Sequence, residues 1–185
     1  MKLSIVSAAV ALALGAVSFQ AAAANDGVIT FNGNITDTTC LVEGQQPGQN
    51  LANKTVTLDN VPASVLAAAG DVATAKGFTI TVGGAGDTGC TDGQTAFVRF
   101  DPTSAAIDPT SGRLNIDTGT GAASNVQVQV LNQNGSVIDL RTQNSAGVVI
   151  ANNTAVIPLA AQYYATGAAT AGAANSRVGY QIVYN

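Results

Sequence analysis

Apolar and polar residues alternate in the final stretch of the chain, Arg177–Asn185. No proline interrupts this stretch, and its single charge is Arg177 at its start. The chain ends one residue after the last apolar position, so no following strand is expected to pair here, and one strand edge is predicted to be open. Every second side chain is apolar or aromatic, the spacing that places side chains on one face of a β-strand: Val178, Tyr180, Ile182 and Tyr184.

The same period of two recurs along the chain. Helical composition is confined to residues 63–75, where Gly70 limits any helix to a turn or two. Pro158 indicates an edge strand or a bulge in its run. Seven or more short strands between turns predict an all-β, immunoglobulin-like sandwich. The predicted strands cover residues 27–36, 54–59, 78–82, 95–101, 114–116, 126–130, 136–140 and 155–164.

The first 24 residues have the composition of a secretory signal peptide. Lys2 supplies a positive start, residues 3–19 are apolar, and the alanines at 21–24 offer a cleavage site. No later apolar run reaches membrane-spanning length. The net charge is −4 and no lysine or arginine cluster occurs, which argues against nucleic acid and anionic membranes as partners.

Cys40 and Cys90 are the only cysteines. An export signal places them in an oxidising compartment, so they are predicted to form one disulfide. A redox-active cysteine pair is the alternative, but such pairs are typically spaced C-x-x-C.

Candidate catalytic chemistry is sparse. The chain has no histidine, which excludes Ser-His-Asp triads, Cys-His pairs and His-ligated metal sites. Residues 87–92 carry oxygen ligands without the spacing of a calcium-binding EF-hand, and the glycines of 83–86 open no helix for phosphate binding. Tyr163 and Tyr164 could stack on a sugar, although strand aromatics more often lie in a core or an interface. We predict a protein that is not an enzyme and that uses no metal and no cofactor.

Several motifs point to one family. Gly27–Phe31 precedes Gly33 and Cys40, and the chain contains the segment Ile-Pro-Leu-Ala-Ala-Gln-Tyr-Tyr-Ala-Thr-Gly at 157–167 and ends with Gly172 and Tyr184-Asn185. These features resemble fimbrial subunits of the chaperone–usher class, in particular type 1 pilus major subunits. The resemblance implies a pilin sandwich over residues 37–185 that lacks its seventh strand, and an N-terminal donor-strand extension over 25–36 that supplies this strand to a neighbouring subunit.

The resemblance also implies roles for individual residues and partners. Gly27, Ile29 and Phe31 would enter the groove of another copy. The implied partners are other pilin subunits, a periplasmic chaperone and an outer-membrane usher, with export through the periplasm to the fimbrium on the cell surface. The acceptor groove and chaperone-binding strand would include Gly172, Val178, Tyr180, Ile182 and Tyr184.

Two alternatives stay open. The first is a closed sandwich in which residues 27–35 form an ordinary first strand. The second is a minor or tip-associated adhesin subunit with its own sugar-binding site. A two-domain adhesin would be about twice as long and would lack the donor extension, so we favour the structural subunit.

Overall fold

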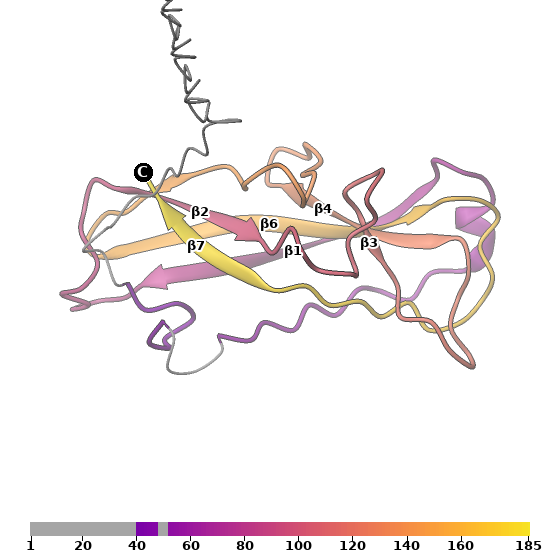
Figure 1. The fold of residues 1–185 in the computed structure, drawn as a ribbon, viewed down its shortest axis with the longest axis horizontal. Helices are drawn as coiled ribbons and strands as arrows, with labels where there is room; N and C mark the ends of the chain where they lie inside the picture. Colours follow the sequence, from indigo (N-terminus) through magenta and orange to yellow (C-terminus); the bar gives the residue numbers. More distant parts are fainter. Residues whose placement is uncertain (1–39, 48–51) are drawn as a thin grey trace, which may run out of the picture. The chain divides into compact units, whose positions relative to one another are not determined.

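A computed structural model describes residues 40–47 and 52–185 (Figure 1). The strand predicted over residues 27–36 lies outside them. The regular secondary structure of the described part is almost entirely β, as predicted. Its elements are the short 3₁₀ helix η1 (Ala63–Leu66) and the strands β1 (Val72–Gly83), β2 (Thr95–Phe100), β3 (Leu114–Asn115), β4 (Val126–Asn132), β5 (Val148–Val149), β6 (Thr154–Ala165) and β7 (Tyr180–Tyr184).

The strands form two antiparallel sheets whose inner faces share one core. One sheet has the order β1-β6-β4-β3 and the other the order β5-β2-β7. Buried side chains from both sheets meet between them, including Ile80 of β1, Ile157 of β6 and Val98 of β2. This arrangement confirms the predicted two-sheet sandwich.

Strand β4 is more buried than its alternating sequence suggests. Val128 and Val130 face the core, yet Gln127 and Gln129 are also buried, only 6% and 4% exposed. Their amides are satisfied within the sheet, because Gln127 donates to Asn115 and Gln129 accepts from Gln162. Buried amides that are hydrogen-bonded in this way are tolerated inside a sheet.

The strands of the structure differ from the predicted ones in several places. β1 begins at Val72, inside the segment of helical composition, and a register shift between Ala73 and Lys76 interrupts its pairing with β6. Residues 136–140 contribute only a single bridge, from Val137 to Leu131, because their chain soon leaves the edge of β4. The sequence did not predict β5, whose two residues are too short to show a period.

The expectation from Pro158 was wrong. β6 is an inner strand between β1 and β4 rather than an edge strand, and the bulge lies in β1 instead. Pro158 pairs with Thr79 of β1, whereas the last pair between β4 and β6 is Asn132 with Leu159. The proline therefore lies just beyond the end of β4, where β6 has a strand partner on one side only, and its missing N–H costs the sheet nothing on the other side.

Candidate functional site: the open edge of β7

β7 is the last strand of its sheet and pairs with a single neighbour among the described residues, β2. Its sequence, Tyr-Gln-Ile-Val-Tyr, contains no charge and no proline. Charges and prolines are the usual means by which proteins prevent an edge strand from pairing with another chain. The side of β7 that faces away from β2 is called the open edge below.

The register of β7 shows which backbone groups the open edge offers. Thr95 and Asn185 exchange both of their backbone hydrogen bonds, and the Asp101 N–H donates to the Gly179 carbonyl. Because hydrogen-bonded pairs alternate along an antiparallel ladder, residues 179, 181, 183 and 185 bond to β2. The backbone groups of Tyr180, Ile182 and Tyr184 therefore point to the open edge.

The side chains of the same alternating positions face the core. Val178, Tyr180, Ile182 and Tyr184 all pack against the main hydrophobic cluster, yet each is only half-buried. The alternation predicted from the sequence is thus present. The residues whose backbone groups face the open edge, Tyr180, Ile182 and Tyr184, are also residues whose side chains the core covers only in part.

An extended segment, residues 52–61, is called the strap below. The sequence predicted a strand over 54–59, but the strap is not one in the structure. Backbone groups of residues 53–61 make no hydrogen bond to other described residues, and without a ladder an extended segment is not a strand. Half-buried Leu58 fixes the strap to the core, and a Lys76–Asp59 ion pair of 3.0 Å fixes it to β1.

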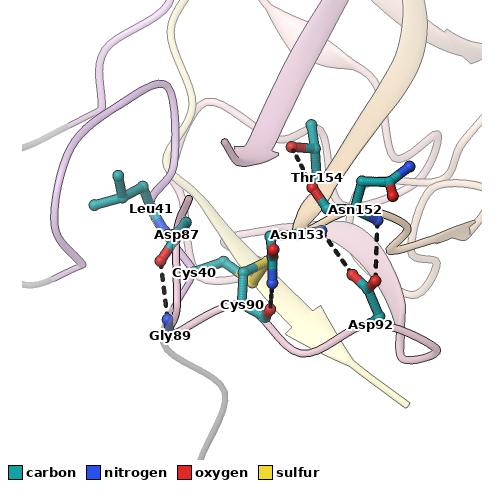
Figure 2. Close-up of a disulfide and its surroundings, with 9 residues drawn as sticks. All are labelled: Cys40, Leu41, Asp87, Gly89, Cys90, Asp92, Asn152, Asn153 and Thr154. Carbon is teal, nitrogen blue, oxygen red and sulfur yellow. Dashed lines mark hydrogen bonds between the residues drawn. A yellow bond between two sulfur atoms is a disulfide. The ribbon is translucent and has the colours of Figure 1, made fainter. Parts of the chain in front are cut away.

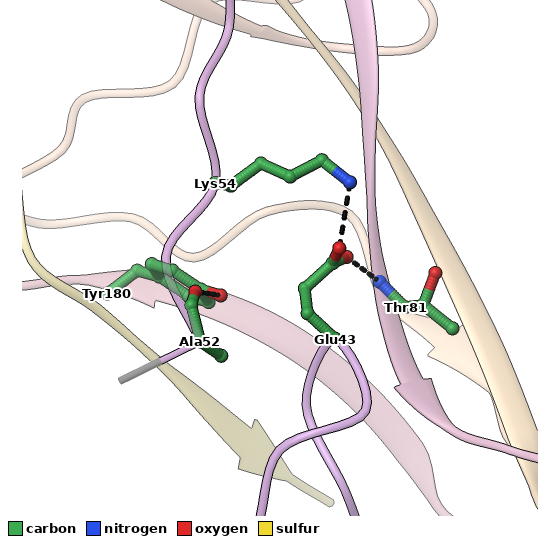
Figure 3. A network of polar contacts seen from close by, with 5 residues as sticks. All are labelled: Glu43, Ala52, Lys54, Thr81 and Tyr180. Atoms are coloured by element: carbon green, nitrogen blue, oxygen red, sulfur yellow. Dashed lines mark hydrogen bonds and ion pairs between the residues drawn. The ribbon is translucent and has the colours of Figure 1, made fainter. Parts of the chain in front are cut away.

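Glu43, the only glutamate of the chain, ties the beginning of the strap to β1 (Figure 3). Its carboxylate accepts from the Thr81 N–H at 2.7 Å and from the Lys54 ammonium at 2.8 Å. Partial burial acts to raise the pKa of Glu43, but the hydrogen bonds from Lys54 and Thr81 outweigh it and hold the pKa below its ordinary value of 4.5. The ionised form is therefore favoured in the folded protein.

Glu43→Gln is expected to lower the free energy of unfolding at pH 7 by about 0.5–1 kcal/mol, because the charged hydrogen bond to Lys54 is lost. Since the folded pKa is depressed, this contribution is present above pH 4.5 and disappears as the pH falls through the folded pKa. Urea unfolding at several pH values measures it. A difference between wild type and variant that persists at pH 2 would contradict this origin.

The predicted disulfide joins Cys40 to Cys90 (Figure 2). It connects the first described residue to the loop between β1 and β2. Asp87 reinforces the connection by accepting from the N–H groups of Leu41 at 2.8 Å and Gly89 at 3.1 Å. The chain at Cys40 and Leu41 is therefore anchored firmly to the sandwich.

Both aspartates of residues 87–92 have structural partners. Asp87 binds the backbone as described, and Asp92 accepts from the N–H groups of Asn152 at 3.0 Å and Asn153 at 2.6 Å. The Asn153 side chain in turn donates to the Cys90 carbonyl at 2.7 Å (Figure 2). These aspartates hold loops together around the disulfide.

The two adjacent tyrosines of β6 lie on opposite faces of their sheet. Tyr163 packs against the main hydrophobic cluster and against a second, smaller cluster of buried residues that includes Leu66 and Val126. The ring of Tyr164 is covered by the Arg113 guanidinium, whose Cζ lies 3.6 Å from the ring centroid. The arginine occupies the ring face that a sugar would need for stacking.

Gly172 lies outside β7, in the connector that precedes it. A side chain there would place its Cβ 2.4 Å from the Ala123 nitrogen and 2.5 Å from the Ala122 carbonyl carbon. Ala173 pairs with Ala122 directly beside it. The glycine permits this close approach of two backbones, a packing role that the sequence did not reveal.

The predicted donor residues Gly27, Ile29 and Phe31 lie outside the described residues.

Comparison with known proteins defines the family. The model of the fimbrial protein family matches residues 29–185. The chain belongs to this family. It is 42% identical over 176 residues to the F17 fimbrial protein of Escherichia coli, covering 92% of this chain and 94% of that protein. It is 38% identical over 173 residues to the major fimbrial subunit SMF-1 of Stenotrophomonas maltophilia (strain K279a), covering 89% and 96%.

A solved structure of a chaperone-usher pilus contains a chain of the same fold, with a TM-score of 0.57 at 19% identity over 87% of this chain and 96% of that one. The family model and the fimbrial relatives confirm the resemblance inferred from sequence motifs. This fimbrial protein is a structural component of the fimbrium at the cell surface and not an enzyme. Within residues 40–47 and 52–185, no helix is long and apolar enough to cross a membrane.

Proposed function

We propose that this fimbrial protein is a polymerising subunit whose open β7 edge accepts residues 25–36 of a second copy. The observation that supports this most directly is the coincidence at Tyr180, Ile182 and Tyr184. Their backbone groups have no strand partner among the described residues, and their side chains are half-covered. An added strand would supply both the backbone ladder and the missing apolar cover.

The predicted donor strand has a matching pattern. Gly27, Ile29 and Phe31 fall at every second position, so they would share the face directed toward the core of the neighbour. Burying Ile29 and Phe31 would contribute about 1.5–3 kcal/mol each. Each backbone hydrogen bond to β7 would add about 0.5–1.5 kcal/mol. Together, the burial of these side chains and the row of backbone hydrogen bonds would make the joint stable, as a filament under tension requires.

The same edge explains the need for assembly partners. An uncharged edge strand that exposes apolar side chains is prone to pair with any available strand. We propose that a periplasmic chaperone covers the open edge during export and that an outer-membrane usher passes the subunit to the growing fimbrium. In this scheme the subunit forms a homopolymer, and the joint rather than any ligand-binding residue carries the function.

Gly27→Leu is expected to abolish polymer formation. A leucine side chain at an inward-facing donor position would collide with the neighbour where a glycine allows backbones to approach closely. Polymer is measured as a ladder of bands that resists dissociation in detergent, together with filaments seen by electron microscopy. The matched control is Gly84→Leu, because an added Cβ at Gly84 has no neighbour within 4 Å.

The Gly27→Leu subunit should still fold, because residues 25–36 belong to the joint and not to its own sandwich. It should therefore still bind a synthetic peptide of wild-type residues 25–35 through its own β7. Normal filament yield from Gly27→Leu would rule out the donor assignment. Failure of both Gly27→Leu and Gly84→Leu to polymerise would show that the readout reports folding instead.

A further inference from the structure

Tyr180 makes a contact that reaches across the open edge. Its hydroxyl donates a hydrogen bond to the carbonyl of Ala52, the first residue of the strap (Figure 3). The two residues are 128 positions apart in the chain. The ring itself packs against the main core cluster and is half-buried. The tyrosine therefore spans from β7 to the strap on the core side of the open edge.

The beginning of the strap is thereby tied to both sheets within three residues. Ala52 is bound by Tyr180 of β7, and Lys54 is bound by Glu43, which also accepts from Thr81 of β1. By contrast, the backbone of residues 53–61 has no hydrogen bond to other described residues. The contacts that hold the strap near β7 are therefore concentrated at its first residues.

We propose that the hydrogen bond from Tyr180 to Ala52, here called the clasp, holds the empty subunit closed and must open before a donor strand enters. This inference rests on the proposed strand exchange and adds a residue that sets its rate. A donor strand bonded to Tyr180, Ile182 and Tyr184 would lie about 4.8 Å from β7. Its inward side chains would need the space that the Tyr180 side chain spans to reach the strap.

Opening the clasp loses one hydrogen bond, and completion of the joint restores one. Once the donor is in place, the Ala52 carbonyl can accept from the donor backbone, and the Tyr180 hydroxyl can reach water. The clasp thus stabilises the empty subunit relative to the state that admits a strand, without stabilising the filled joint. A residue of this kind changes the rate of entry and leaves the rate of exit unchanged.

Tyr180→Phe tests the clasp because it removes only the hydroxyl. The mature full-length chain, oxidised and kept dilute, is mixed with excess fluorescent peptide of residues 25–35, and binding is followed by anisotropy. Loss of one typical hydrogen bond corresponds to a factor of about 2–10. Tyr180→Phe should therefore bind the peptide about 2–10-fold faster than wild type and release it at the same rate. Tyr164→Phe, on the outer face of the other sheet, is the control and should match wild type.

The outcomes separate the clasp from the proposed function. Peptide binding to all variants with equal or slower entry into Tyr180→Phe would overturn the clasp and leave strand exchange standing. Faster release from Tyr180→Phe would also overturn it, because the hydroxyl would then act in the filled joint. Failure of the peptide to bind any variant would overturn strand exchange and the clasp together.

Discussion

Replacing Cys40 and Cys90 together by alanine is expected to lower the free energy of unfolding by about 3–5 kcal/mol, a large share of the stability of one domain. The disulfide closes a long loop, since the two cysteines are 50 residues apart. In the chain-entropy model a loop of this length restricts the unfolded chain by roughly 4 kcal/mol. Both cysteines are also essentially fully buried, so the lost sulfur atoms leave poorly filled space.

Thermal unfolding measures the effect, and for a domain of this size the midpoint should fall by about 6–20 °C. Wild-type protein under strong reductant is the matched control, because it loses the bond but keeps both sulfur atoms. It should lose most, but not all, of the stability that the double variant loses. A double variant within 1 °C of oxidised wild type would show that the loop is already constrained by Asp87 and its bonds to Leu41 and Gly89.

This disulfide also has a consequence for assembly. Cys40 comes shortly after the predicted donor extension in the sequence. The residues after Cys40 pair with the end of β1, where Gly83 donates to Leu41 and Glu43 to Thr81. In the proposed filament, tension carried by residues 25–36 enters the subunit at this point. The covalent bond to Cys90 transfers that load to the β1–β2 loop rather than to a few hydrogen bonds.

The strands predicted correctly are those in which the alternation of residues shows by itself which side chains face the core. In β2, Ala96, Val98 and Phe100 are buried at every second position. In β7, Tyr180, Ile182 and Tyr184 pack against the core, although each is only half-buried. The disulfide followed from the export signal and the cysteine count. The open edge of β7 followed from its sequence as well, because its alternation contains none of the residues that block edge pairing.

The features missed from the sequence depend on partners that are distant in the chain. The strap has a strand-like pattern, but strand formation requires a ladder that the described residues do not provide. Pro158 is accommodated in an inner strand only because β4 ends one residue away. The contact between Tyr180 and Ala52 spans 128 residues and has no local signature. The role of Glu43 was equally hidden, although its status as the only glutamate was a signal.

Gly83→Ala is expected to destabilise the sandwich by about 2–5 kcal/mol. Gly83 has a φ of +75°, a conformation that costs an alanine about 1–2 kcal/mol. An added Cβ would lie 2.0 Å from the Asn153 carbonyl oxygen and 2.8 Å from the Cys90 sulfur. Asn153 cannot move aside easily, because its backbone is bound to Asp92 and its side chain to the Cys90 carbonyl. Relieving this overlap adds about 1–3 kcal/mol.

Two further glycines separate the backbone cost from the collision. Gly84→Ala has neither a positive φ nor a neighbour within 4 Å, so its stability should stay within about 0.5 kcal/mol of wild type. Gly135→Ala has a φ of +83° in open space and should show the backbone cost alone. Urea unfolding of all three variants gives the comparison. If Gly83→Ala is no less stable than Gly135→Ala, the backbone at Asn153 moves aside for the added methyl group. The loops around the disulfide would then be more flexible than their hydrogen bonds indicate.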